Sequence, residues 1–296
     1  MKIALARVLI RLLSLMPLWL LHGLAVPLGW LINRVPSRRR AVIDTNIGLA
    51  FPELSTGEKR QLRQQNLIEM TRLVLESGAV WYWSRKRILA HVPEVSGWEH
   101  VEAAQHRGKG YMLVSGHLGN WEILNLYASI RQPMACLYKA PADDRINRLI
   151  TASRQRFGGR LIASGSPAMR QIVAQLRNGG GIGLLFDQQP KQGEGVFAPL
   201  FGTEALTMTL VNRLVRRSDC AILMLSCRRL PRGRGWALTV TPADERIASA
   251  DPVTAIACLH DWLEEQIRLN PAQYLWSYKR YSLRPQGQAP IYPARR

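Results

Sequence analysis

The residues best suited to chemistry in this chain lie in a short glycine-containing stretch in its first half. An apolar run, Tyr111 to Val114, leads into Gly116 and His117, and a carboxylate, Glu122, follows five positions after the histidine. Five positions on one continuous helix turn two side chains about 140° apart, so this pair can converge only if the histidine precedes the helix. A carboxylate in a first helical turn is favoured in its ionised form and can hold an imidazole in one tautomer. The spacing therefore predicts a histidine that acts as a base near neutral pH.

The elements expected around this pair are a buried strand and a helix joined by a tight turn. Tyr111 to Val114 has the length and apolar character of a buried strand. Gly116 and Gly119 permit a sharp bend, and Asn120 is a good N-cap for the apolar stretch that follows. Glu122 then falls in the first turn of the helix.

This stretch resembles the His-x-x-x-x-acid motif of the lysophospholipid and lipid A acyltransferases. Its glutamate variant is similar to the late acyltransferases of lipid A biosynthesis. A single His-x-x-x-x-Glu pair arises by chance in many proteins, but further segments resemble that family's landmarks in the same order and cover nearly the whole chain. The segments are Asn46 to Glu53, Gly116 to Glu122, Arg154 to Gly159, Phe186 to Gln189, Pro199 to Thr207 and Tyr274 to Arg280.

The resemblance implies transfer of a fatty acyl group from a carrier-protein or coenzyme A thioester, with acyl carrier protein as the implied donor. The implied acceptor is a hydroxyl of a phosphorylated, acylated glucosamine lipid, the lipid A precursor. A thioester is already activated and no serine or cysteine nucleophile is evident, so we expect a ternary complex without an acyl-enzyme and no cofactor. His117 would be the general base, and Glu122 would orient it and stabilise the imidazolium. Backbone N–H groups of the turn or an arginine would stabilise the developing oxyanion.

Six further residues are expected to bind substrate. Arg154 and Arg156 precede a Gly-Gly break, so one could reach the active site while its neighbour faces elsewhere. Asp187 follows an expected strand, and α/β sheets usually place ligand contacts at the carboxyl ends of strands. The alternatives are an exposed helix face for the arginines, a capped turn for Asp187 and a solvated C-terminal cluster for Arg280. The six are Asn120, Arg154, Arg156, Asp187, Gln188 and Arg280. His260, by contrast, is expected to be a surface or helix-packing residue.

The charge balance points to anionic partners. The chain carries 40 basic and 21 acidic side chains, a formal net charge of +19, and 33 of the basic residues are arginines. A guanidinium binds phosphate or carboxylate oxygens through two bonds, so a phosphorylated lipid, an anionic membrane surface and an acidic carrier protein are natural partners. A genome that favours arginine codons is the alternative source of the excess.

Two other functions fit part of the sequence. A glycerolipid acyltransferase typically carries aspartate in the catalytic pair and a Pro-Glu-Gly-Thr-Arg-like segment, whereas this chain has Glu122 and Asp187-Gln-Gln-Pro-Lys191. A non-catalytic basic protein that binds membranes or nucleic acid would account for the charge but would leave the His117 turn unexplained. We therefore expect no nucleic-acid partner.

The cysteines indicate a reducing compartment. Cys136, Cys220, Cys227 and Cys258 lie scattered in apolar segments without a close metal-ligand spacing, so we expect reduced core residues and no structural metal.

The first 33 residues predict a membrane anchor. No charged residue occurs between Arg11 and Arg34, so Leu12 to Asn33 could form roughly 33 Å of helix, enough for a hydrocarbon core of ~30 Å. Pro17 and Pro27 can kink this helix, and an interfacial or shallow hairpin is the alternative. If the basic cluster from Arg34 to Arg40 marks the inside, the rest of the chain faces the cytoplasm at the inner membrane.

Beyond the anchor, the pattern predicts an α/β domain. Thr56 to Trp83 has the spacing of an amphipathic helix, and its end, Trp81 to Arg87, is typical of either a membrane-surface contact or a packed helix end. From Gly110 onward, short apolar runs alternate with helical patterns. We expect residues 34–296 to form one acyltransferase domain with a mixed central sheet flanked by helices, similar to glycerol-3-phosphate acyltransferase, behind the anchor at residues 1–33. The expected elements are strands near Met134 to Tyr138 and Ile182 to Phe186, helices near Asp143 to Phe157, Pro167 to Arg177 and Pro252 to Leu269, and a strand pair from Cys220 to Cys227 and Trp236 to Thr241.

Overall fold

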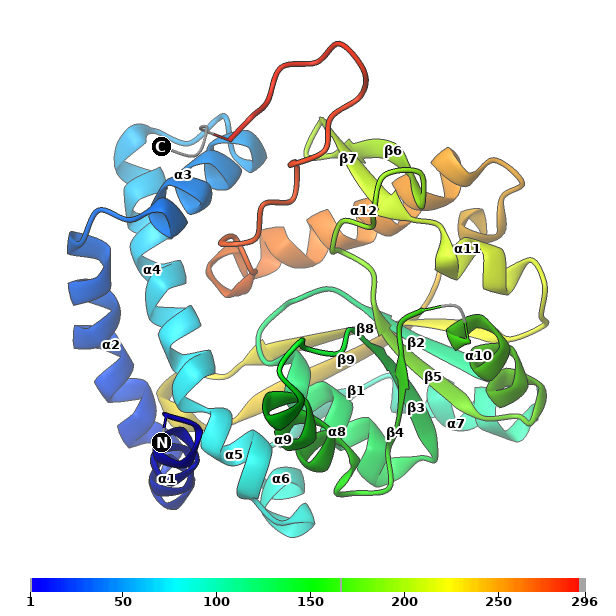
Figure 1. Cartoon of the computed structure of the whole chain (residues 1–296), viewed down its shortest axis with the longest axis horizontal. Helices are drawn as coiled ribbons and strands as arrows, with labels where there is room; N and C mark the ends of the chain where they lie inside the picture. Colours follow the sequence, from blue (N-terminus) through cyan, green and yellow to red (C-terminus); the bar gives the residue numbers. More distant parts are fainter. Residues whose placement is uncertain (1, 166, 293–296) are drawn as a thin grey trace.

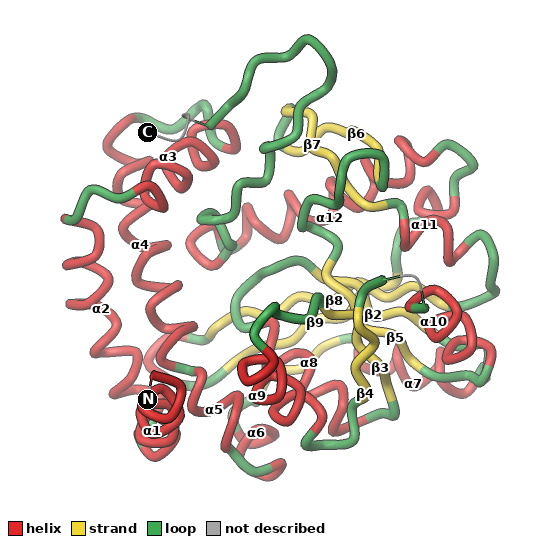
Figure 2. The backbone as a smooth tube through the Cα atoms, in the orientation of Figure 1, coloured by secondary structure: helices red, strands yellow, loops and turns green. Residues whose placement is uncertain are grey.

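The computed structural model describes residues 2–165 and 167–292, and its centre is a seven-stranded mixed sheet with helices on both sides (Figures 1 and 2). The strand order is β1-β9-β8-β2-β5-β3-β4. The strands from β8 to β4 run parallel, whereas β9 is antiparallel to β8. The bounds are β1 Glu94–Ser96, β2 Tyr111–Ser115, β3 Met134–Tyr138, β4 Arg160–Ala163, β5 Gly181–Leu185, β8 Ala221–Arg229 and β9 Trp236–Pro242. The predicted α/β class with a mixed central sheet is confirmed, and the likeness to glycerol-3-phosphate acyltransferase stays a prediction.

The helices and a small hairpin complete the fold. Strands β6 Gly195–Leu200 and β7 Thr203–Met208 pair antiparallel outside the main sheet. Strand β3 and helix α12 have the predicted bounds, and the predicted pairing of β8 with β9 is confirmed. The helices are α1 Lys2–Leu15, α2 Leu18–Arg34, α3 Arg38–Ala50, α4 Thr56–Leu75, α5 Ser77–Tyr82, α6 Arg85–Ala90, α7 Trp98–His106, α8 Trp121–Arg131, α9 Asp144–Gln155, α10 Ala168–Arg177, α11 Leu210–Val215 and α12 Pro252–Leu269.

Strand β2 lies at the centre of the sheet and is buried along its whole length. Side chains alternate between the two faces of a strand. Met112 and Val114 therefore join the hydrophobic cluster that includes α10 and α12, whereas Tyr111 and Leu113 join the cluster that includes α7 and α8. Helices on both faces explain why this strand is apolar from Tyr111 to Val114 rather than alternately polar.

The predicted single helix from Leu12 to Asn33 is wrong at Pro17. Helix α1 ends at Leu15, and Pro17 occupies the N-cap of α2 in an extended conformation. Proline disfavours helical geometry in the residue before it, which separates the two helices, whereas Pro27 lies inside α2. Among the described helices none is both long and apolar enough to cross a bilayer alone; α2 and α3 qualify only as a pair, bent by 95°.

Helix α2 has one buried face and one exposed apolar face. Its residues Leu18, Leu21 and Ala25 are buried, and α2 runs alongside α4 (Figure 1). A side chain at Gly29 would meet the backbone of Ile68 on α4, so this glycine permits the close approach. The opposite face exposes a further row of large apolar side chains, including Trp19, Leu24, Leu28 and Leu31.

The segment from Trp81 to Arg87 packs against α1 through Trp83. Trp83 is buried, and its indole N–H donates to the Ser14 carbonyl at 2.9 Å. Arg87 stacks on the Trp83 ring and donates to the same carbonyl at 3.1 Å. The packed helix end, one of the two predicted alternatives, therefore describes Trp83.

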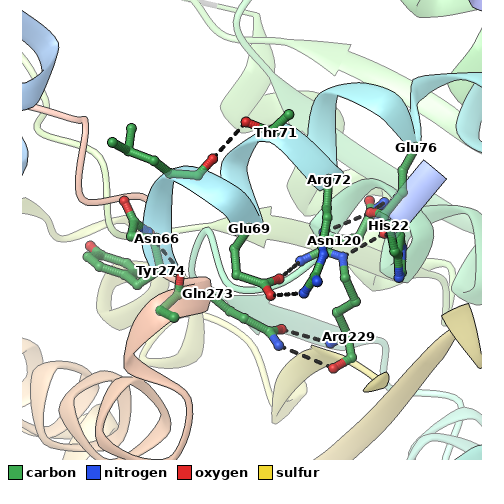
Figure 3. Close-up of polar contacts among 12 residues, drawn as sticks. His22, Asn66, Glu69, Thr71, Arg72, Glu76, Asn120, Arg229, Gln273 and Tyr274 are labelled. Atoms are coloured by element: carbon green, nitrogen blue, oxygen red, sulfur yellow. Dashed lines mark hydrogen bonds and ion pairs between the residues drawn. The ribbon is translucent and has the colours of Figure 1, made fainter. Parts of the chain in front are cut away.

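A buried polar cluster connects α2, α4, β8 and the N-cap of α8 (Figure 3). Glu76, between α4 and α5, accepts two hydrogen bonds from the Arg229 guanidinium, at 2.5 and 2.7 Å, and one from His22 at 2.7 Å. Asn120 donates to the same carboxylate at 2.8 Å, and Arg229 also donates to Glu69 at 2.6 Å. Burial alone would raise the pKa of Glu76, but Arg229, with a smaller contribution from His22, outweighs it and lowers the pKa from 4.5 to about 2.

Glu76 should therefore contribute to acid stability. A carboxylate whose pKa is lower in the folded state stabilises the fold above its unfolded pKa, and this contribution is lost as the pH falls through the folded pKa. The difference in free energy of unfolding between the wild type and Glu76→Gln should thus be largest above pH 4.5 and should shrink toward about pH 2. Urea unfolding of both proteins across this range is the measurement; a difference that does not change with pH would contradict the expectation.

Candidate active site

His117 and Asp187 meet at the carboxyl ends of two neighbouring parallel strands. Strand β2 ends at Ser115 and strand β5 ends opposite it at Leu185, so the turns that follow lie side by side. The imidazole Nδ1 lies 2.7 Å from Oδ1 of Asp187, and the backbone N–H of His117 donates to Oδ2 at 2.8 Å. A side chain at Gly116 would crowd Asp187 and Leu263, so glycine there permits the approach. One carboxylate therefore fixes both the backbone and the ring of His117.

This geometry determines the tautomer of His117. Burial opposes ionisation of Asp187, but the charge of His117 and its hydrogen bonds outweigh burial and lower the pKa of the carboxyl. An ionised carboxylate can only accept, so Nδ1 carries a proton, and in the neutral imidazole Nε2 then presents a lone pair. The side-chain nitrogen of Gln188 lies 3.2 Å from Nε2, and the Trp121 ring packs edge-on against the imidazole. Nε2 is thus the basic atom of the site.

The structure corrects the predicted partner of Glu122. Its carboxylate does not hold the imidazole in the described contacts; it accepts a bidentate pair of bonds from Arg154, one of them at 2.9 Å from Nε. Glu122 lies in the first turn of α8 and faces α9, which carries Arg154 near its end. In the described contacts it is therefore Asp187, predicted to contact substrate, and not Glu122 that bonds to the imidazole.

Asn120 is the N-cap of α8, as predicted, and its side chain bonds to groups inside the protein. Its Oδ1 accepts from the Ile123 N–H at 3.1 Å, and its Nδ2 donates to Glu76. The residue is completely buried. Both ends of the amide are engaged inside the protein, and the substrate contact stays a prediction.

Arg154 and Arg156 point to different partners. Arg156 donates to the carbonyls of Trp83 and Val80, the latter at 2.7 Å, at the carboxyl end of α5. Burial lowers its pKa to about 10. Arg156 therefore caps a helix, while Arg154 extends toward Glu122.

Arg280 and His260 lie inside the protein rather than at its surface. Arg280 donates to the Leu206 carbonyl at 2.7 Å and to the Thr207 hydroxyl. His260 donates from Nδ1 to the Pro199 carbonyl at 2.7 Å, and burial lowers its pKa to about 3, so it is neutral. Arg280 is therefore not part of a solvated cluster, and its contact with substrate stays a prediction. His260 is a helix-packing residue rather than a surface one.

A largely apolar cavity adjoins the His117 turn. Its charged lining is the Glu122–Arg154 pair, and strands β2, β3 and β5 and helix α8 supply the rest. The lining includes Leu113, Trp121, Leu124, Met134, Leu137 and Leu184. No cluster of three or more metal-ligating side chains occurs in residues 2–165 and 167–292. The imidazole of His117, the guanidinium of Arg154 and the apolar cavity therefore lie next to one another.

A family model described as bacterial lipid A biosynthesis acyltransferase matches residues 2–282. The chain belongs to this family. It is 28% identical to the lipid A biosynthesis lauroyltransferase of Escherichia coli K12 over 92% of this chain and 88% of that protein. It is 27% identical to the palmitoleoyltransferase of the same strain, over 94% and 90%, and 24% identical to its myristoyltransferase, over 86% and 78%. The predicted family is confirmed, and the chain is an acyltransferase of lipid A biosynthesis. The names of these relatives differ in the acyl group.

The residues of this lipid A acyltransferase that sequence reasoning missed are those whose role depends on strand order. Asp187 was singled out because it ends a strand, but its bond to His117 follows only once β5 is known to neighbour β2. The pairing of Glu76 with Arg229 has no local signal, because the two residues lie 153 positions apart in the chain. The one usable signal is Glu76 within the largely apolar stretch from Leu73 to Val80, because a glutamate is rarely buried unless it is paired.

The two arginines should differ in how they respond to lysine. Arg154→Lys keeps the charge but loses the bidentate contact with Glu122, so we expect kcat to fall at least tenfold with little loss of stability. Arg156→Lys should keep kcat and lower the melting temperature, because fewer donors remain for the α5 carbonyls. Steady-state kinetics and thermal melts of both variants are the measurement, and equal, near-full activity would remove Arg154 from the site.

Proposed function

We propose that this lipid A acyltransferase moves a fatty acyl group from an acyl carrier protein thioester to a hydroxyl of a phosphorylated, acylated glucosamine lipid, without an acyl-enzyme or cofactor. The buried Asp187–His117 pair carries the proposal. It fixes the proton on Nδ1 and leaves Nε2 as the base, 3.2 Å from the Gln188 amide. A substrate hydroxyl would take the position of that amide.

The reaction needs one proton to leave and one to return. Nε2 of His117 removes the proton of the acceptor hydroxyl as its oxygen attacks the thioester carbonyl, and Asp187 stabilises the resulting imidazolium. The tetrahedral intermediate then collapses, the carbon–sulfur bond breaks, and the imidazolium returns its proton to the leaving thiolate. An ester and a free thiol result, and the enzyme is unchanged.

Arg154 is the proposed donor to the developing oxyanion. The N–H groups of His117, Leu118 and Gly119 already donate to Asp187, Gly116 and Gln273. These three turn amides are occupied, which favours the arginine of the two predicted alternatives. Glu122 holds the guanidinium in place, so a fixed positive group would be present before charge develops. The apolar cavity beside this pair suits the acyl chain.

The exposed face of α2 and the positive charge support attachment to the inner membrane, with the active site on the cytoplasmic side. The apolar side chains of this face are suited to the lipid interface, and the basic residues to anionic headgroups. The four cysteines are free, as expected in a reducing compartment. An acidic carrier protein would complement the net charge of +19.

The proposed chemistry predicts that His117→Ala abolishes transfer without unfolding the protein. The loss of a general base typically costs ~10²–10⁴-fold in rate. Purified wild type and variant would be supplied with an acyl carrier protein thioester and an underacylated lipid A precursor, and the products identified by mass spectrometry. The wild type should add one acyl group; a well-folded His117→Ala protein with near-normal rates would eliminate the mechanism.

The membrane proposal predicts that polar substitution of the exposed α2 face releases the protein. Changing Trp19, Leu28 and Leu31 to serine removes about 1.5–3 kcal/mol of apolar burial per side chain while leaving the packed face intact. Val253→Ser with Leu269→Ser, on exposed positions of α12, is the matched control. Sedimentation with anionic vesicles in high salt should show loss of binding for the first variant alone; equal binding by all three proteins would place the contact elsewhere.

A further inference from the structure

Two hydrogen bonds and one close contact hold the turn that carries His117 on its side near β8 and Glu76. The N–H of Gly119 donates to the Gln273 carbonyl at 2.9 Å, and Asn120 donates to Glu76 at 2.8 Å. Gly119 has φ +54, and a side chain there would strike the Cys227 carbonyl, so the turn lies directly against β8. These residues are the second half of the turn whose first half contacts Asp187.

Both hydrogen-bonding supports converge on Arg229. The Gln273 side chain accepts from the Arg229 N–H at 2.8 Å and donates to the Arg229 carbonyl at 3.1 Å. The guanidinium of the same residue holds Glu76 through two bonds (Figure 3). Arg229 is 3% exposed and Glu76 is fully buried, so water does not compete for these bonds. The backbone of Arg229 therefore supports Gly119 by way of Gln273. Its side chain supports Asn120 by way of Glu76.

The cluster also reaches helix α2. His22, buried on the packed face of α2, donates to Glu76 at 2.7 Å. The opposite face of the same helix is the exposed apolar face. A displacement of α2 would remove one of the donors that fix the Glu76 carboxylate on which Asn120 rests.

We propose that Arg229 and Glu76 are positioning residues for acyl transfer, which hold the His117 turn through Gly119 and Asn120, and that His22 makes the seating of α2 part of this geometry. The proposal rests on the proposed function for the His117 site. A turn with glycines at 116 and 119 has little conformational restraint of its own, so its position depends on such contacts. Misplacement of a catalytic group by about 1 Å can cost ~10²-fold in rate.

Three changes test the proposal in the full chain. Glu76→Gln removes the central charge. Gln273→Ala keeps the carbonyl that accepts from Gly119 but removes the side chain that ties this carbonyl to the Arg229 backbone, without stranding a buried charge. His22→Leu removes the link to α2. Each should lower kcat at least tenfold and change KM for thioester and lipid less than twofold. Hydrogen exchange of the amides in residues 116–123 should rise at least tenfold. His22→Gln, which keeps a donor toward Glu76, should restore both readouts.

Asn212→Ala is the matched control. Asn212 is also buried, and its side chain donates to the carbonyls of Ile247 at 2.9 Å and Ser249 at 3.0 Å, but among the described residues no hydrogen bond connects it to the turn or to α2. It should lower the melting temperature and leave kcat and exchange of residues 116–123 unchanged. If Glu76→Gln fails to fold, Gln273→Ala and the two His22 variants decide.

Normal kcat in folded Gln273→Ala and His22→Leu would overturn the proposal, as would a loss of kcat without faster exchange in residues 116–123. Exchange does not require turnover, so it separates this proposal from the proposed function. Faster exchange in a protein whose wild type transfers no acyl group would support the positional coupling and reject the proposed reaction. If the wild type transfers an acyl group but exchange of residues 116–123 is unchanged in the variants, the proposed reaction would be supported and the positional coupling rejected.

Discussion

The hydrogen-bonded pair of Asp187 and His117 is the interaction on which the rest of the site depends. It exists because β2 and β5 are neighbours in the sheet and end at the same edge, so that two short turns bring a carboxylate and an imidazole within 2.7 Å. Because Asp187 also accepts the His117 N–H, ring and backbone are fixed by the same group. The pair is almost completely buried, which strengthens the interaction and leaves one nitrogen of the ring as the basic atom.

Several charged side chains are buried in the cluster that contacts the His117 turn. Arg229, Glu76 and Glu69 are removed from water, and breaking such a pair by deleting one partner typically costs about 3–5 kcal/mol. A domain is usually stable by only about 5–15 kcal/mol in total. We therefore propose that these buried groups serve to position the His117 turn more than to raise the free energy of unfolding. The apolar N-terminal helices belong to this arrangement, because α2 contributes both a packed face and His22.

Much of the fold could be predicted because its signals are local. The all-apolar run of β2, the bounds of β3 and α12 and the Asn120 N-cap follow from periodicity, composition and capping within a few residues. The break at Pro17 was also signalled, although the prediction favoured a continuous helix. The family was readable from ordered motifs along nearly the whole chain.

The pairing within the site could not be predicted in the same way. The sequence spacing predicts a contact between His117 and Glu122. In the structure the imidazole contacts Asp187, because β5 neighbours β2, and Glu122 contacts Arg154 of α9. Arg280 looked like a surface cation among its neighbours, and only the packing of β7 and α12 around it shows that it is buried. Such long-range contacts depend on topology, which a local pattern does not contain.

The most direct test of the account is the tautomer of His117, measured by ¹⁵N NMR of histidine-labelled protein. The chain has 6 histidines, and the His117→Ala spectrum identifies the signal. The account predicts a proton on Nδ1 and a bare Nε2 at neutral pH, and a loss of this preference in Asp187→Asn but not in Glu122→Gln. A proton on Nε2 in the wild type, or a tautomer that changes with Glu122 and not with Asp187, would contradict it.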